Sequence, residues 1–201
     1  ELLQNADDAG ATHFLVEKYG NYLIVANNGR IFSASDVESL CRSASSSKVR
    51  GSSIGYRGIG FKSVVSIAKE VHIISGDYEI TFSKEITRSI IPEATKVPLI
   101  RIPHFIRSSV KNELCNTIDH LKVNNYTTFF IFSGVPIEQI KNEYEGFLHT
   151  SLLFLNNIRE INVKIENPII TYVDTIYDSG EYKQKVVIDS NKKTEWRIYY
   201  K

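Results

Sequence analysis

ELLQNADDA, at residues 1–9, is the stretch that indicates the fold most strongly. Its apolar residues recur at helical spacing and predict one packed face of a short helix: Leu2, Leu3, Ala6 and Ala9. Its polar residues Glu1, Asn5 and Asp8 lie three and four residues apart, on a neighbouring stripe of the same helix. A carboxylate one turn from an amide oxygen suits a site that activates water beside a Mg²⁺-bound phosphate. A polar face turned to solvent is the alternative.

A second stretch follows directly along the chain. Gly10 ends the predicted helix, and alternating runs at 12–18 and 22–26 predict a hairpin with its turn at Gly20. The chain then leaves the second strand through ANNGRIF, at residues 26–32. Two asparagines and a glycine are typical of an ordinary tight turn, and this reading is favoured when the stretch is taken alone. Asn27, at the end of the strand, is also placed to present an amide to the hydrogen-bonding edge of a ligand.

The third stretch is GYRGIGFKS, at residues 55–63, a glycine-rich loop that runs straight into a predicted helix. Free N–H groups at a helix start hold phosphate oxygens, and glycines let the backbone approach them closely. The spacing is neither that of a Walker A loop nor that of a dinucleotide-binding loop. The small, polar residues 43–54 before it predict a lid. Ser35 and Glu38 have the capping-box form and predict a helix over 36–42.

The remainder of the chain predicts mainly strands. Residues 127–132 form a continuous β-branched and aromatic run, so we expect this strand to be central in the sheet. Residues 84–107 give no sustained period and are expected to be irregular around one short strand at 99–102. Trp196 is expected in the core. The other predicted elements are helices at 109–122 and 137–156, and strands at 71–75, 78–83, 158–165, 169–177, 182–189 and 195–200.

Composition limits the class of protein. The 201 residues are 42% hydrophobic and carry a formal charge of +1, which predicts one substantial core and no global attraction to nucleic acid. The two cysteines lie far apart and suggest neither a disulfide framework nor a zinc site, which favours a reducing, intracellular setting, with a cytoplasmic location. The five histidines show no metal-ligand spacing. No run approaches the roughly 20 apolar residues of a membrane span. Because Glu1 lies inside a helix already under way, we interpret the chain as part of a larger protein.

Taken together, the three stretches resemble the signatures of GHKL ATPases, the Bergerat-fold domains of gyrase B, MutL, histidine kinases and ninety-kilodalton heat-shock proteins. ELLQNADDA is similar to the pattern E-x-x-x-N-A-x-D-A, NNGRIF lies where D-x-G-x-G belongs, and GYRGIGFKS is similar to G-x-x-G-x-G-F. The phrases GIGFKSV and NNG-x-x-F most resemble the sacsin-like branch of the superfamily. The resemblance is strong over residues 1–83 and thinner beyond them.

The resemblance implies roles for particular residues. Glu1 would be the catalytic general base, Asn5 would ligate Mg²⁺, and Asn27 would take the place of an aspartate that binds the adenine amino group. Thr128, or else Thr127, would take the place of a strand threonine in the water network behind the base. The implied nucleotide-binding residues are Asn5, Asp8, Asn27, Gly29, Phe32, Gly55, Tyr56, Arg57, Gly58, Ile59, Gly60, Phe61, Lys62 and Thr128.

Two residues depart from the family pattern. Asn27 replaces the aspartate, and Ile31 stands where a second glycine would be. A hydrogen bond to a neutral group is worth about 1 kcal/mol less than one to a charged group, so binding through Asn27 is expected to be weaker. Adenine recognition is expected to survive but to loosen, because the amide oxygen still accepts from an amino group. An amide can also turn to offer its NH₂, which weakens the preference for adenine over guanine.

The sequence patterns and the resemblance together predict a fold, a domain division and a function. The fold is an α/β two-layer sandwich, a mixed, mostly antiparallel sheet with helices on one face. Residues 1–165 form the ATP-binding domain, and residues 166–201 form a β-meander that extends it. The function is slow Mg²⁺-dependent ATP hydrolysis that closes the lid and controls a homodimer or an intramolecular domain contact, without direct binding to nucleic acid or membrane. The alternatives are a nucleotide sensor or partner-binding module without turnover, and a histidine-kinase-like phosphotransferase, against which Glu1 counts.

Overall fold

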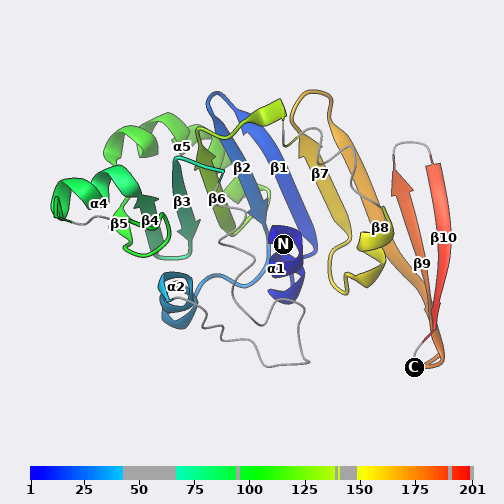
Figure 1. Ribbon diagram of the computed structural model, residues 1–201. Coiled ribbons are helices and arrows are strands. Elements are labelled where there is room, and N and C mark those ends of the chain that lie inside the picture. The colour runs from blue at the N-terminus through cyan, green and yellow to red at the C-terminus, as the bar shows by residue number, and fades with distance from the viewer. Residues whose placement is uncertain (43–66, 94–95, 139, 141–148, 190–191, 200–201) are drawn as a thin grey trace.

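A ten-stranded β-sheet forms the body of the chain in the computed structural model (Figure 1). The structure describes residues 1–42, 67–93, 96–138, 140, 149–189 and 192–199. The strands lie in the order β10-β9-β8-β7-β1-β2-β6-β3-β4-β5. Their bounds are β1 His13–Tyr19, β2 Tyr22–Asn27, β3 Glu70–Ser75, β4 Tyr78–Ser83, β5 His104–Phe105, β6 Thr128–Ser133, β7 Glu160–Lys164, β8 Ile169–Asp178, β9 Tyr182–Asp189 and β10 Lys192–Tyr199.

The sheet is mixed and mostly antiparallel, as the sequence predicted. Among the strands described, β1 and β7 form the one parallel pair, and every other neighbouring pair is antiparallel. The hairpins β1–β2 and β3–β4 turn at Gly20 and Gly76, whose φ angles are +55° and +56°. These left-handed conformations suit glycine and explain both turns. Strand β6 lies between β2 and β3, which confirms the predicted central strand.

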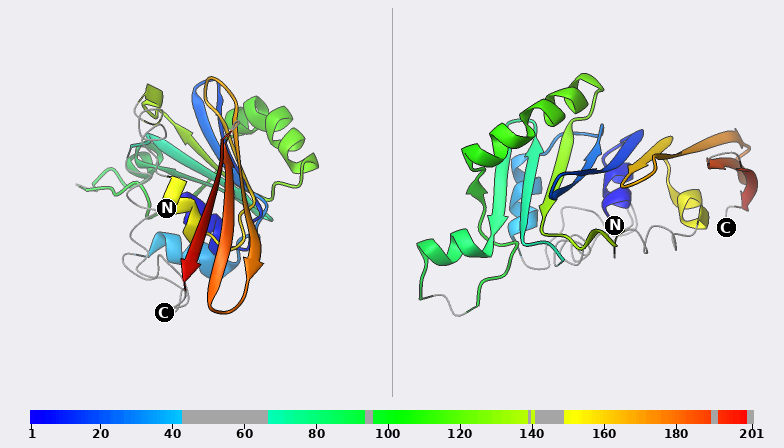
Figure 2. Two further views of the ribbon diagram at one scale, coloured as in Figure 1. Left: turned by 90° about the vertical axis from the view of Figure 1, so that its right-hand side faces the viewer. Right: turned by 90° about the horizontal axis from the view of Figure 1, so that it is seen from above.

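Helices cover both faces of the sheet (Figure 2). On one face, a core cluster joins Ala6 of α1 to Phe14, Val25, Phe130 and other strand residues, and Leu40 of α2 packs against it. On the other face, Leu114 of α5 belongs to a second core cluster. The helices are α1 Leu2–Asp8, α2 Ala34–Cys41, α4 Lys84–Ile90, α5 Ser108–Val123 and the 3-10 helix η1 His149–Phe154.

The sequence predicted all helices on one face, and the position of α5 corrects that detail. Leu23 and Val25 of β2 point to the α1 face, whereas Ile24 and Ala26 point to the α5 face. A strand that is apolar on both sides must be covered on both sides. The apolar stripe of α5 supplies the second cover: Val110, Leu114, Ile118 and Leu121.

Three local predictions need further correction. Helix α2 begins two residues earlier than expected, because Ser33 caps it and Asp36 completes the capping box instead of Ser35 and Glu38. Residues 84–107 contain helix α4 and the short strand β5, whereas residues 99–102 form no strand. Of the predicted helix over 137–156, residues 139 and 141–148 lie outside the described residues, and its later part contains the 3-10 helix η1. The predicted lid at 43–54 and the helix after Gly60 also lie outside them.

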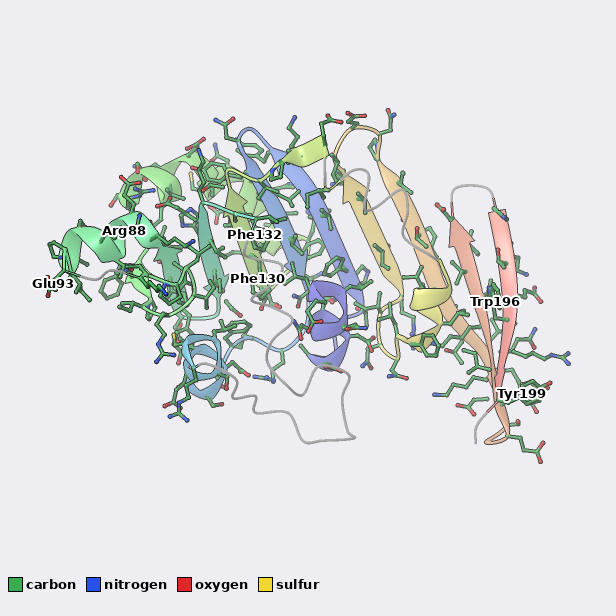
Figure 3. All side chains as sticks on the ribbon, in the orientation of Figure 1. Arg88, Glu93, Phe130, Phe132, Trp196 and Tyr199 are labelled. Carbon is green, nitrogen blue, oxygen red and sulfur yellow. The ribbon has the colours of Figure 1, made fainter. Side chains whose placement is uncertain are left out.

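The last three strands extend the same sheet. Val173 of β8 and Val187 of β9 are buried in the α1-face cluster. In β10, the edge strand, Trp196 is 37% exposed and Tyr199 is 68% exposed, so the expectation of Trp196 in the core was wrong. Phe130 and Phe132, by contrast, lie in the middle of the sheet (Figure 3). In the described part of the chain, no helix is long and apolar enough to cross a membrane.

Candidate functional site

A row of three polar side chains lies at the ends of three central strands of the sheet. Asn27 of β2 pairs in register with Thr128 of β6, which pairs with Ser75 of β3. Because side chains alternate along a strand, all three point to the same face as their neighbours Val25, Phe130 and Ile73 of the α1-face core. All three are buried. Register partners have Cβ atoms about 4.5–5.5 Å apart, so the row is continuous across the three strands.

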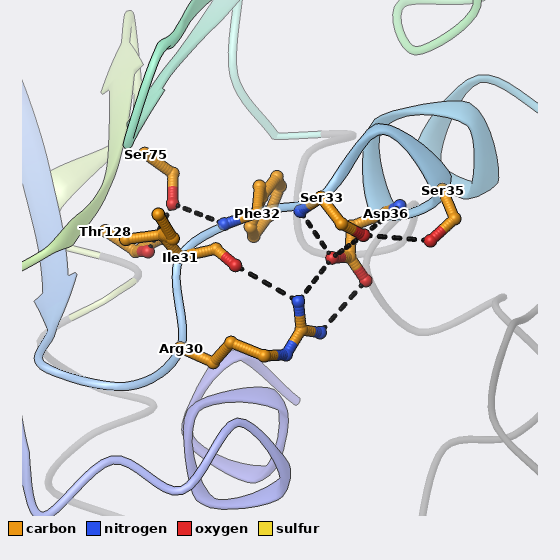
Figure 4. Close-up of polar contacts among 8 residues, drawn as sticks. All are labelled: Arg30, Ile31, Phe32, Ser33, Ser35, Asp36, Ser75 and Thr128. Carbon is orange, nitrogen blue, oxygen red and sulfur yellow. Dashed lines mark hydrogen bonds and ion pairs between the residues drawn. The ribbon is translucent and has the colours of Figure 1, made fainter.

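The two hydroxyl groups of this row form a short network. Ser75 Oγ and Thr128 Oγ1 are 2.6 Å apart, and Ser75 Oγ accepts a hydrogen bond of 3.0 Å from the backbone N–H of Phe32 (Figure 4). The network therefore ties the segment after β2 to the ends of β3 and β6. The ring of Phe32 packs edge-on against Phe130 at 5.9 Å between centroids, above the apolar part of the same face.

The first two sequence stretches meet beside this row. The backbone N–H of Arg30 donates to the carbonyl oxygen of Ala9 over 2.8 Å, which fixes the end of α1 against the segment after β2. A Cβ atom at Gly29 would lie 3.0 Å from both the Cβ and the oxygen of Ala9. Such contacts are closer than most side chains make, so glycine favours the close approach of the helix here.

The amide of Asn27 has a defined orientation. Its Oδ1 accepts a hydrogen bond of 3.0 Å from the backbone N–H of Gly29. The Nδ2 group carries only donors and could not take this place. The hydroxyl of Thr127 is used elsewhere, since it donates to the carbonyl oxygen of Gly29 over 2.7 Å. Of the two candidate threonines, Thr128 is therefore the one whose side chain joins the polar row.

Asn28 has a structural role. Its Oδ1 accepts hydrogen bonds from the backbone N–H groups of Thr12 and His13 at 2.8 and 2.9 Å, and its Nδ2 donates to Thr12 Oγ1 at 2.8 Å. These bonds fasten the end of β2 to the start of β1. The ANNGRIF stretch thus contains both an ordinary structural asparagine and one that belongs to the polar row.

Arg30 and Asp36 fix the segment that leads from the row to α2. Their ion pair measures 2.7 Å, and the carboxylate of Asp36 also accepts from the backbone N–H of Ser33 (Figure 4). Partial burial acts to raise the pKa of Asp36, but the hydrogen bonds from Arg30 and Ser33 outweigh it and lower the pKa to about 2. Asp36 therefore stays charged and holds the start of α2 in place.

Helix α1 carries the remaining described candidates. The helix confirms that Glu1, Asn5 and Asp8 share one face, with Glu1 and Asp8 exposed and Asn5 half-buried. The candidates of the glycine-rich stretch lie outside the described residues: Gly55, Tyr56, Arg57, Gly58, Ile59, Gly60, Phe61 and Lys62.

Two residues near the site were missed from the sequence. Ser75 gave no signal, because its role depends on the register between β3 and β6, which are far apart in the chain. Asp7 stands beside Asp8 but is buried, and its carboxylate accepts from the backbone N–H groups of Asn156, Asn157 and Ile158 at 2.6–3.0 Å. The clue to Asp7 was its position next to Ala6, on the packed side of α1.

These observations define an α/β protein with a buried polar row beneath a short helix. No protein-family model matches the sequence. The chain is similar to Protein NO VEIN of Arabidopsis thaliana, with 32% identity over 208 residues. The match covers 95% of this chain and 7% of that protein, so the chain spans a small part of its relative's length.

The chain is also similar to solved structures. One of them is the crystal structure of the N-terminal domain of a DNA repair protein, with 14% identity and a TM-score of 0.42. The match covers 94% of this chain and 64% of that one.

Proposed function

We propose that this chain is a GHKL-type module that binds a purine nucleoside triphosphate together with Mg²⁺, ATP being the nucleotide that the sequence resemblance implies. The observation that carries the proposal is the meeting of separated stretches at one place. Ala9 of the first stretch touches Gly29 of the second, and Asn27 of the second lies in register with Thr128, about 100 residues away. A purely structural turn at 27–30 would not need a buried polar row beside it.

The residues at this place suit the parts of a nucleotide. Asn27, Thr128 and Ser75 offer amide and hydroxyl groups that suit the hydrogen-bonding edge of a base. The Phe32 side chain, half-buried beside Phe130, offers an apolar surface next to that edge. The glycine-rich residues 55–60 would receive the phosphates on their backbone N–H groups.

The polar face of α1 suits a metal-assisted reaction. Asn5 supplies an amide oxygen, which is a hard ligand of the type that Mg²⁺ takes. Bound Mg²⁺ would polarise phosphate oxygens and neutralise their charge. Glu1, one helical turn away on the same face, would accept a proton from the attacking water. We propose slow hydrolysis that changes how this domain associates with a second copy or with another domain.

Calorimetry tests the binding step. Mg²⁺–ATP is titrated into the protein and into the Asn5→Ala variant, with Gln4→Ala as the matched control on the same helix. We expect saturable binding that the Asn5→Ala change weakens at least tenfold and the control leaves nearly intact. Absence of binding of every purine nucleoside triphosphate tested, up to millimolar concentration and in protein that circular dichroism shows to be folded, would refute the proposal and favour a partner-binding role.

Hydrolysis of the nucleotide needs a separate test, because the same binding site would also suit a sensor that binds nucleotide without hydrolysing it. The replacement of an aspartate by Asn27 in the second stretch favours that alternative. Phosphate release measured for the protein and for Glu1→Gln distinguishes the two. Release that depends on Glu1 supports the hydrolase, whereas tight binding with no release above the Glu1→Gln level supports the sensor.

A further inference from the structure

We infer that Asn27 presents a hydrogen-bond donor to the bound base, so that the site prefers a purine with an oxygen at C6, guanine or hypoxanthine, over adenine. This inference rests on the proposed nucleotide-binding function and specifies which base that site selects. Its basis is the orientation of one buried amide.

The amide orientation follows from the Gly29 hydrogen bond. The Gly29 N–H lies 3.0 Å from Asn27 Oδ1, and a turned amide would set two donors against each other at that distance. Gly29 is also buried, so a turned amide would leave its N–H unpaired, which is unfavourable away from water. The backbone therefore removes the freedom that an isolated asparagine would have, and Nδ2 becomes the group turned away from Gly29.

The Nδ2 group is available for a ligand. Among the described residues, the hydrogen bond of the Asn27 side chain is the one that its Oδ1 accepts from Gly29, and it does not use Nδ2. The nearby carbonyl oxygens of Asn27 and Gly29 both accept from the Thr127 hydroxyl. An NH₂ group of this kind pairs with a carbonyl oxygen and is mismatched to the amino group that adenine carries at C6.

The other polar groups of the row do not decide the base. Ser75 Oγ accepts from Phe32 N–H, and the Ser75–Thr128 hydrogen bond can run in either direction because hydroxyl groups rotate. Thr128 can therefore serve as donor or acceptor to the rest of the base edge. Asn27 is the member of the row whose hydrogen-bonding sense is fixed, which makes it the specificity-determining residue.

The test compares ATP, GTP and ITP in the presence of Mg²⁺ by calorimetry. ITP and ATP differ only at the C6–N1 edge of the base, so their ratio isolates the group that Asn27 faces. We expect ITP and GTP to bind about tenfold or more tightly than ATP, which is the scale of one mismatched buried hydrogen bond. In Asn27→Asp both side-chain oxygens accept, so the preference should turn toward ATP.

Asn28→Asp is the matched control, because it makes the same charge change one residue away, where the side chain binds Thr12 and His13. It should leave the ITP-to-ATP ratio unchanged. Tighter binding of ATP than of ITP by the unmodified protein would overturn the inference while leaving the proposed function in place. Failure of all three nucleotides to bind folded protein would overturn both. The ratio of ITP to ATP affinity in the unmodified protein tests the base preference even if Asn27→Asp does not fold.

Discussion

Asp7 is a buried carboxylate that connects two distant segments of the chain beneath the site. It joins α1 to the loop before β7 by accepting from three successive backbone N–H groups. The buried Lys185 of β9 binds the carbonyl oxygen of Leu155 in the same region. Burial, together with the charges of Lys183 and Arg159, lowers the pKa of Lys185, and Asp7 opposes that shift. Asp7 therefore joins segments that lie about 150 residues apart in the chain.

Replacing Asp7 by asparagine should destabilise the fold by about 1–3 kcal/mol, because an amide NH₂ would then face backbone donors in a buried place. Urea unfolding followed by circular dichroism measures the change in the free energy of unfolding. Asp8→Asn makes the same charge change at an exposed position and should cost less than about 0.5 kcal/mol. Equal effects of the two substitutions would contradict the assigned role of Asp7.

The ion pair of Asp36 gives a pH-dependent contribution. Its pKa of about 2 lies below the ordinary value of 3.8, so folding favours the charged form. The stabilisation is complete above pH 3.8 and is lost as the pH falls through about 2. Arg30 is 59% exposed, so solvent screens the pair and the effect is small.

Urea unfolding between pH 2 and pH 5 measures this contribution as the difference in stability between the protein and Asp36→Asn. The difference should shrink toward acid pH. A difference that stays constant over this range would mean that the carboxylate is not stabilised by its partners.

At the scale of elements, the start of α2 offers the sharpest test. The side chain of Ser33 accepts from the backbone N–H of Asp36, and Asp36 returns the bond to the N–H of Ser33. Ser33→Ala should therefore cost about 1 kcal/mol of stability, as the loss of a helix cap typically does. Ser35→Ala, two residues on, is the control and should cost much less. Thermal unfolding of both variants measures the difference, and a larger effect at Ser35 would restore the cap predicted from the sequence.

The sequence predicted well those elements whose residues follow a clear local pattern. The hairpins β1–β2 and β3–β4 and the helix α5 each have a clear period, with glycine at the two hairpin turns. Helix α4 was missed because its seven residues stand between a strand and a proline-containing segment, where a short period is hard to see. In the site, the resemblance pointed to Asn27 and Thr128, while Ser75 needed the long-range strand register.

At the scale of the whole molecule, stability should decline along the sheet. Strand β6 is paired on both sides and almost fully buried. Strand β10 is an edge strand with mostly exposed side chains. Native-state hydrogen exchange should therefore show the strongest protection in β6 and much weaker protection in β10, since exposed edges open locally. Equal protection of β6 and β10 would instead indicate that the whole sheet opens as one cooperative unit.

The parallel pairing of β1 with β7 also sets an order of events during synthesis. His13 pairs with Glu160, which is synthesised much later. Asp7 likewise binds Asn156 and Ile158, which lie 149 and 151 positions further along the chain. At about 5–20 residues per second, this delay is on the order of ten seconds. Over that interval one edge of β1 lacks its partner strand and α1 lacks its anchor. The polar row can therefore be assembled on the ribosome before Asp7 anchors the helix beside it, so the centre of the sheet forms earlier than the contact that completes the α1 face.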